Sequence, residues 1–164
     1  MQVQATVVTG DLNVNALLGA SQWASTGGQP LELTYSFPDA KSVWSMAAGE
    51  YVPGDGWGPQ IGVTVLSDAA KSAVRAALAA WSTVANIDFV ETADNASGHG
   101  TLRFAWTASL VNEQSIAYGP GTIDKAGDIW LNFLAPWDGF APGAYGYSTL
   151  IHEVGHALGL KHPF

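Results

Sequence analysis

Three histidines near residue 160 lie at a spacing that lets one metal ion hold them together. The segment reads His-Glu-Val-Gly-His-Ala-Leu-Gly-Leu-Lys-His over residues 152–162. On a helix of about 3.6 residues per turn, His152 and His156 lie on one face, about one turn apart. Gly159 can take a positive φ and end the helix sharply, so that His162 returns as a third ligand. Three imidazoles leave one tetrahedral position open, as in a catalytic zinc site.

Glu153 follows the first of these histidines and projects about 100° around the helix from it. A carboxylate in that place lies beside the metal, where it can accept a proton from water that the metal activates. A lone pair of helical histidines is often surface decoration or a hydrogen-bonded core residue. Here five specified positions occur together, which favours a metal site. The chain has no cysteine, so a thiolate site is excluded and histidines and carboxylates remain as the possible ligands of Zn²⁺.

The residues around the motif predict a buried, amphipathic helix. Ser148 or Thr149 offers a cap before the motif, and Pro163 makes it difficult for the helix to resume after the third histidine. An apolar stripe at helical spacing is formed by Leu150, Ile151, Val154, Ala157 and Leu158. The metal ligands are therefore expected on a helix that the core holds in place.

The motif resembles the long zinc signature of the metzincin metalloproteases, and the surrounding sequence is most similar to their serralysin branch. The resemblance extends over about residues 12–164, and is carried by Leu17, Leu18, Trp23, 33–38, 81–89, 127–132 and the motif itself. It implies a zinc-dependent endopeptidase that hydrolyses peptide bonds of proteins. By the same resemblance, the ligands are His152, His156 and His162, and the general base is Glu153.

The sequence departs from the serralysins after the third histidine. In that family a tight turn carrying a methionine follows, with a tyrosine that can approach the zinc, and then glycine-rich calcium-binding repeats. Met1 and Met46 both lie far upstream of the motif. We therefore expect residues 1–164 to form a single catalytic domain without the methionine-turn subdomain, which a downstream segment or a second chain would supply. The alternative is a zinc-binding fragment or interaction module without competent turnover.

The rest of the chain predicts an α+β fold of the metzincin upper-subdomain type. A helix is expected over residues 67–85, capped by Ser67, and a short one over residues 12–24. A loop or hairpin rich in glycine and proline is expected at residues 52–62. Strands are expected at residues 31–37, 87–91, 101–106, 115–118 and 128–133. The order favours a twisted, mixed five-stranded sheet with two main helices, the second of which carries the zinc motif.

By analogy with the family, residues 115–119 are the candidate edge strand that pairs with an extended protein or peptide substrate. Gly119, Pro120 and Gly121 would end that pairing. An ordinary strand and turn fits these residues equally well. The third ligand, with only Pro163 and Phe164 after it, is expected to be poorly held.

Composition excludes several classes of partner. The net charge of −8 argues against a basic surface for nucleic acid or anionic membrane, and no apolar run approaches the roughly 20 residues that span a bilayer. The chain begins without a recognisable signal peptide, and the resemblance implies an extracellular protein exported by another route.

Other polar positions give weaker signals. His99 is more typical of an exposed loop than of a second metal site, and residues 95–97 match a glycosylation sequon too short to identify a pathway. Three aspartates could contribute to Ca²⁺ binding but lack the dense spacing of a calcium loop: Asp124, Asp128 and Asp138.

Overall fold

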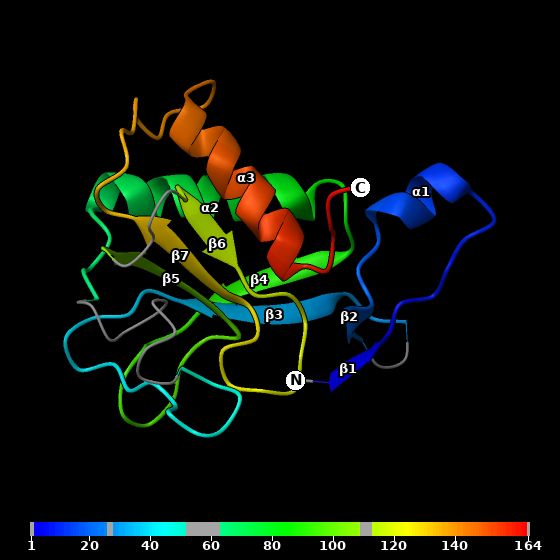
Figure 1. Cartoon of the computed structure of the whole chain (residues 1–164), viewed down its shortest axis with the longest axis horizontal. Helices are drawn as coiled ribbons and strands as arrows, with labels where there is room; N and C mark the ends of the chain where they lie inside the picture. Colours follow the sequence, from blue (N-terminus) through cyan, green and yellow to red (C-terminus); the bar gives the residue numbers. More distant parts are fainter. Residues whose placement is uncertain (1, 26–27, 52–62, 109–112, 164) are drawn as a thin grey trace.

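A mixed five-stranded sheet forms the centre of the molecule (Figure 1). The computed structural model describes residues 2–25, 28–51, 63–108 and 113–163. The strands follow the order β4-β3-β5-β7-β6, and only β6 runs antiparallel to its neighbour. Their bounds are Leu31–Ser36 (β3), Ile87–Glu91 (β4), Leu102–Thr107 (β5), Ser115–Ala117 (β6) and Asp128–Asn132 (β7). The five predicted strands and the mixed sheet are confirmed.

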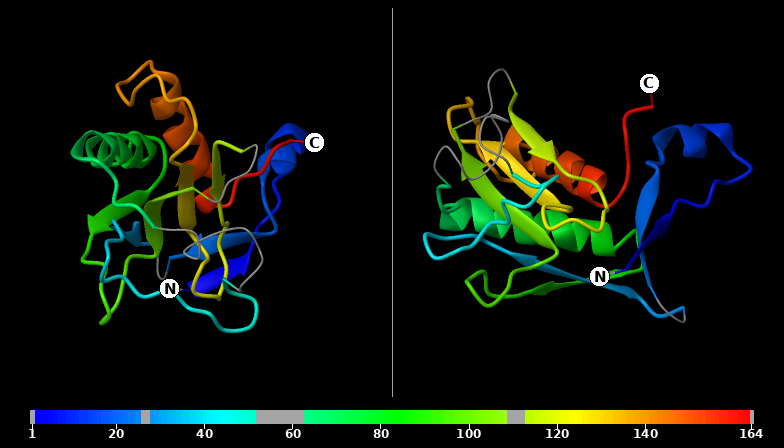
Figure 2. Two further views of the ribbon diagram at one scale, coloured as in Figure 1. Left: turned by 60° about the vertical axis from the view of Figure 1, so that its left-hand side comes forward. Right: turned by 60° about the horizontal axis from the view of Figure 1, so that its bottom comes forward.

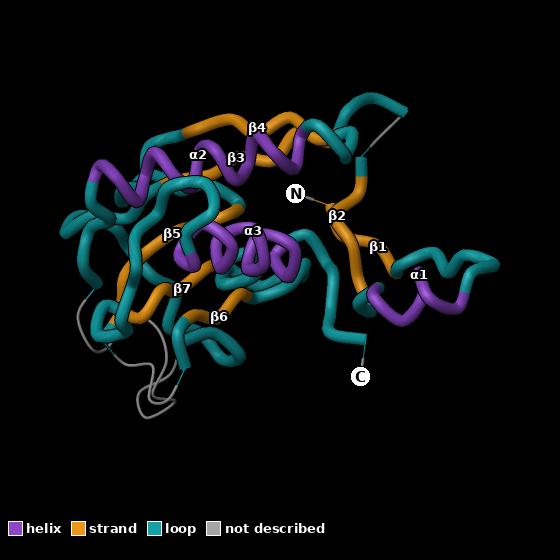
Figure 3. Tube along the Cα trace, turned by 90° about the horizontal axis from the view of Figure 1, so that it is seen from above, coloured by secondary structure: helices purple, strands orange, loops and turns teal. Residues whose placement is uncertain are grey.

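Two helices pack side by side on one face of this sheet, α2 (Asp68–Ser82) and α3 (Tyr145–Ala157) (Figures 1 and 3). Ser67 caps α2 by accepting a hydrogen bond from the backbone N–H of Ala70, as its sequence predicts. Gly155 lets the helices approach, because an added Cβ would lie 3.2 Å from the Trp81 ring. The Trp81 indole in turn donates to the Ile151 carbonyl at 3.1 Å. Helix α3 is therefore fixed from both the sheet and α2.

The central strands β5 and β7 bury side chains on both faces. On β5, Phe104 and Trp106 face the helices, while Ala105 joins Trp130 on the other side of the sheet. The main core lies between the sheet and the two helices. Its fully buried members include Val74, Leu102, Phe104, Ile129, Leu131, Leu150 and Val154. Burial of these large side chains on α3 and beneath it gives the predicted zinc helix a rigid support.

The face of the sheet away from the helices carries buried polar pairs. Arg103 donates to both carboxylate oxygens of Asp94, at 2.8 and 2.9 Å. Burial opposes the charge of Asp94, but hydrogen bonds from Arg103, Ser42 and Ser36 together outweigh it and lower the pKa of this carboxyl. Asp128 accepts from the Tyr51 hydroxyl at 2.7 Å, and burial raises the pKa of Asp128 well above its ordinary value. These hydrogen bonds satisfy buried polar groups on the sheet, and their side chains lie apart from the zinc motif.

The N-terminal part differs from its prediction. The single helix expected over residues 12–24 is wrong, because the chain forms a short helix α1 (Leu12–Leu17) and then a strand β2 (Ser21–Ala24). Strand β2 pairs antiparallel with β1 (Gln2–Ala5), which the sequence analysis did not predict. Trp23 lies on this strand and is buried, and its indole donates to the Ala157 carbonyl at 2.8 Å. The loop expected at residues 52–62 lies outside the described residues.

Helix α1 and the strand after it lie beside the end of α3, close to the C-terminus (Figures 1 and 2). The two views agree with a backbone bridge between Leu18 and Leu160. Segments separated by some 140 residues in sequence are therefore neighbours at the zinc motif. None of the described helices combines the length and apolar content needed to cross a membrane.

Candidate metal centre

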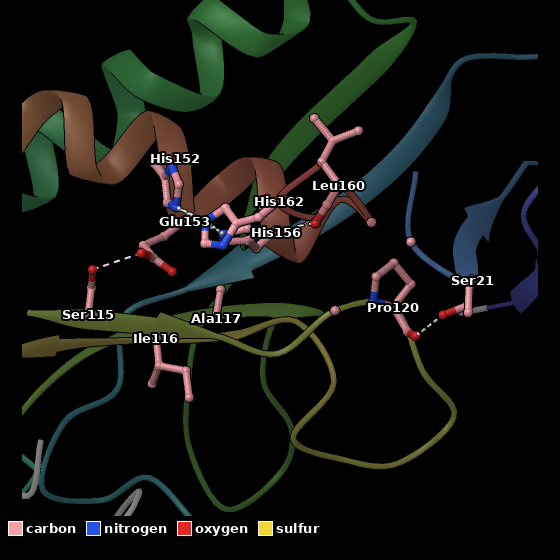
Figure 4. A pocket seen from close by; sticks show the side chains of 14 residues that line it. Ser21, Ser115, Ile116, Ala117, Pro120, His152, Glu153, His156, Leu160 and His162 are labelled. Carbon is pink, nitrogen blue, oxygen red and sulfur yellow. Dashed lines mark hydrogen bonds between the residues drawn. The ribbon is translucent and has the colours of Figure 1, made fainter. Parts of the chain in front are cut away.

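The three predicted histidine ligands converge on one point (Figure 4). Their Nε2 atoms lie 2.9 Å apart for His152 and His156, 3.1 Å for His152 and His162, and 3.3 Å for His156 and His162. Nitrogens that share a tetrahedral zinc at about 2.05 Å are separated by about 3.3 Å. Three imidazole nitrogens therefore face one another at nearly the separation that a single Zn²⁺ would impose.

A hydrogen bond orients the second histidine. Nδ1 of His156 lies 2.9 Å from the carbonyl oxygen of Leu160, where it donates if Nδ1 carries the proton. That tautomer leaves the lone pair of Nε2 directed at the other two rings. Backbone carbonyls commonly hold metal-binding histidines in this way. The donor set consequently fits zinc in chemistry as well as in spacing.

The turn after α3 brings the third histidine back to the other two. Gly159 has φ +109°, the left-handed region that glycine adopts at little cost, as its sequence position predicts. The N-terminal segment then holds the returning strand: Gly19 donates to the Gly159 carbonyl at 2.7 Å, and Lys161 donates to the Leu17 carbonyl at 2.8 Å. His162 thus follows a residue that is fixed by backbone pairing.

This anchoring corrects one expectation. The third ligand was expected to be poorly held because only Pro163 and Phe164 follow it, but its support comes from upstream residues. The Lys161 ammonium adds a further bond, to the Ala16 carbonyl at 2.6 Å. The premise that only the two residues after His162 hold this turn is therefore wrong.

Gly159→Ala is expected to weaken zinc binding by at least about tenfold. A Cβ at this residue would lie 2.8 Å from the Ser21 carbonyl oxygen, and the positive φ would be strained as well. Both effects push the turn that presents His162. Gly139→Ala is the matched control, since its φ is +118° but its Cβ would meet nothing within 4 Å. Competition with a zinc chelator measures both variants, and equal affinities would show that the turn does not set the ligand geometry.

The predicted base lies next to the histidines and is held by a strand. Glu153 is 5% exposed, and its Oε1 accepts a hydrogen bond of 2.8 Å from the Ser115 hydroxyl on β6 (Figure 4). Both residues line a cleft of about 490 Å³ that also contains the three histidines. One wall of the cleft is α3, another is β6 with residues 119–120, and residues 19–21 close one end. Ser21 joins two of these walls by donating to the Pro120 carbonyl at 2.6 Å.

Strand β6 is the edge of the described sheet and turns part of its backbone toward the cleft. The carbonyl of Gln114 and the N–H of Tyr118 bond to β7 at 2.8 and 2.9 Å. Alternate residues of an antiparallel strand point their backbone groups to opposite sides. The backbone groups of Ser115 and Ala117 are therefore directed away from β7. The strand ends at Ala117, ahead of the glycine-proline turn, as predicted.

Some functional details were not found from the sequence. The predicted cap at Ser148 or Thr149 is wrong: α3 begins at Tyr145, and Asp138 accepts hydrogen bonds from the first backbone N–H groups of the helix. The hydroxyl of Ser115 and the wall at residues 19–21 were also missed. Only the period-2 placement of Ser115 in a predicted edge strand carried a signal for the first of these.

The weaker candidates lie elsewhere. Nε2 of His99 lies 3.1 Å from Oδ1 of Asp124, a contact between two side chains that does not form a metal cluster. Asp128 binds Tyr51, and Asp138 caps α3. Within the part of the chain that the structure describes, the three motif histidines form the one group of three or more metal-binding side chains. The three aspartates considered for calcium are not brought together.

Comparison with known proteins agrees with this geometry. The Matrixin family (Peptidase_M10) matches residues 62–164. A serralysin of Photorhabdus sp. (strain Az29) is 29% identical over 154 residues, which cover 88% of this chain and 29% of the relative. A serralysin of Proteus mirabilis is 33% identical over 157 residues, 83% of this chain and 28% of the relative. Serralysin C of Dickeya chrysanthemi is 37% identical over 92 residues, 52% and 19% respectively. The chain spans less than a third of the length of these relatives.

The family match covers more than half of the chain, from the residues before α2 to the third histidine. It therefore includes strands β4 to β7 and the whole histidine cluster. The mixed sheet and the position of the histidine-bearing helix agree with the upper subdomain that the motif predicts. The chain belongs to the Matrixin (Peptidase_M10) family and, among the metzincin metalloproteases, is similar to the serralysins.

Proposed function

We propose that this chain carries the zinc-binding part of an endopeptidase that hydrolyses peptide bonds of proteins. The observation that supports the proposal most is the convergence of three Nε2 atoms within 3.3 Å of one another, beside a nearly buried glutamate in an open cleft. Membership of a metallopeptidase family supports the same reaction class. His152, His156 and His162 hold Zn²⁺, and Glu153 is the general base.

When bound, the zinc lowers the pKa of water and polarises the carbonyl of the substrate. Glu153 accepts a proton from the attacking water, whose oxygen bonds to the carbonyl carbon of the peptide. The same carboxyl then gives the proton to the amine nitrogen as the C–N bond breaks. One carboxyl group thus serves first as base and then as acid, and is unchanged after the cycle.

The substrate lies extended along β6 and adds a strand to the sheet. The outward backbone groups of Ser115 and Ala117 supply hydrogen bonds that are independent of the substrate's side chains. This pairing places a peptide carbonyl between β6 and α3, which carries Glu153. The turn at residues 119–121 limits the length of the pairing.

The proposal is tested by cleavage of an unfolded protein at known zinc occupancy. We expect hydrolysis at internal peptide bonds, loss of activity with a chelator, and recovery when Zn²⁺ is restored. The longer protein that includes residues downstream of Phe164 is assayed together with residues 1–164. No cleavage by the longer, zinc-loaded protein would contradict the proposal.

The second candidate is a zinc-binding module that has no turnover by itself. It is favoured by the coverage of the relatives, of which this chain spans 28–29% in the two longest matches. We expect residues 1–164 alone to cleave poorly, because a cleft without the methionine-turn subdomain excludes water and orients substrate less well. Equal rates for the two forms, at equal zinc occupancy, would show that residues 1–164 are sufficient for hydrolysis.

An extracellular location is part of the proposal and rests on the resemblance to the serralysins.

A further inference from the structure

The general base has one hydrogen-bond donor among the described residues, the hydroxyl of Ser115. Glu153 is 5% exposed, so most of the water that would solvate its carboxylate is removed. A buried carboxylate requires donors in place of that water, and a bond from a hydroxyl to a charged oxygen is among the stronger kinds. The hydrogen bond from Ser115 therefore stabilises this carboxylate more than a bond from a serine on the open surface would.

Ser115 and Glu153 lie between two cavities. Both residues line the main cleft, and both also line a second cavity of about 320 Å³ that extends toward Tyr145 and Ser148 at the start of α3. The terminal torsion of a glutamate is soft, so the carboxylate could turn toward either space. The hydrogen bond to Oε1 removes that freedom and leaves Oε2 for the proton of the attacking water.

We propose that Ser115 is a positioning residue for Glu153: its hydroxyl holds the carboxylate in the orientation that proton transfer requires. The inference rests on the proposed function of Glu153. Strand β6 is suited to this role because its pairing with β7 fixes the Ser115 backbone, with Ser115 opposite Leu131. The side chains of Ser115 and Ala117 share the face toward α3, whereas Ile116 points to the opposite side of the sheet (Figure 4).

A purely structural role would look different. Ala117 occupies the same face of β6 two residues later and packs against the core with a methyl group alone. Packing against α3 therefore does not demand a hydroxyl on this strand. The hydroxyl at residue 115 instead donates directly to the side chain that the reaction uses.

Three variants test this assignment, in whichever of the two forms assayed above cleaves an unfolded protein. Ser115→Ala is expected to lower kcat about tenfold, with KM within about twofold, because peptide pairing uses the unchanged backbone. Ser115→Thr keeps the hydroxyl on a side chain that suits a strand, and should return kcat to within about threefold of the parent. Ser82→Ala is the control: its exposed hydroxyl donates to the Ile87 carbonyl away from the cleft. It should leave both constants unchanged.

Zinc content, thermal unfolding and a crystal structure of Ser115→Ala complete the test. Zinc content and the unfolding midpoint should match the parent, and the Glu153 carboxylate should be rotated or occupy two orientations. An unchanged kcat, a change in KM alone, or loss of zinc would overturn the positioning role. Glu153→Gln is assayed in parallel. If Glu153→Gln is as active as the parent, the proposed mechanism fails; if it is inactive and Ser115→Ala is normal, only the present inference fails.

Discussion

Glu153→Gln is expected to keep its zinc and to hydrolyse peptides about a hundred to ten thousand times more slowly than the parent protein. Glutamine preserves the length of the side chain, and its amide oxygen can still accept the 2.8 Å hydrogen bond from Ser115. It cannot take a proton from water as a carboxylate does. The loss should fall on kcat, since Glu153 is not one of the three converging ligands.

Cleavage kinetics on an unfolded protein, with zinc measured in the same samples, check this result. Glu91→Gln is the matched control, because Glu91 is paired with Arg75 on the surface and is not a lining residue of the cleft. A hydrogen bond from Arg75 lowers the pKa of Glu91, so the control removes a charged carboxylate of comparable chemistry. Near-normal turnover by Glu153→Gln would remove this residue from the mechanism, whereas loss of zinc would make it a ligand or a structural support.

Local pattern was sufficient to predict the sheet and the two main helices. Strands β5 and β7 place apolar residues at every second position, and the stripe ending at Leu78 and Trp81 repeats at helical spacing. The histidine motif was predictable for the same reason, since His152 and His156 lie within one helix and Gly159 ends it. Each of these signals is contained in a short stretch of chain.

The features that failed to be predicted depend on contacts between distant segments. Residues 16–19 hold the turn at residues 159–161 through backbone groups, which leave no pattern in the sequence. The cap of α3 comes from Asp138, seven residues before Tyr145, where the intervening loop makes the spacing unreadable. Ser115 is read as an ordinary strand residue until the fold places it against Glu153. Tertiary placement, and not local propensity, decides each of these cases.

The sequence alone also underestimated how well the third ligand is held. Chain ends are usually mobile unless tied down, and the N-terminal segment ties down this one. Because residues 16–19 hold the turn that presents His162, we expect residues 1–164 to bind zinc even if they hydrolyse peptides slowly. Metal affinity and proteolysis are expected to separate in this chain, so they need separate measurements.

His156→Ala is expected to weaken zinc binding by more than about a hundredfold. Loss of a residue that only hydrogen-bonds to a metal ligand costs up to about a hundredfold in metal affinity, and loss of a ligand should cost more. The Nε2 atom of His156 lies within 3.3 Å of both other ligand nitrogens, and its Nδ1 is bound to the Leu160 carbonyl. Alanine removes a ligand and also one contact that holds the turn before His162. The two remaining imidazoles leave the ion open to water on two sides, so activity should be lost with the metal.

His99→Ala is the control for this prediction. The chain has four histidines, and His99 is the one outside the cluster, paired with Asp124 at 3.1 Å. The parent and His99→Ala should each bind one zinc per chain after dialysis, and His156→Ala should bind much less at the same free zinc concentration. Circular dichroism separates loss of the ion from loss of the fold, because the core beneath α3 does not use the His156 ring. A folded His156→Ala protein that retains zinc at the parent's affinity would show that the three histidines do not act as one site, and the assignment of the metal centre would fall.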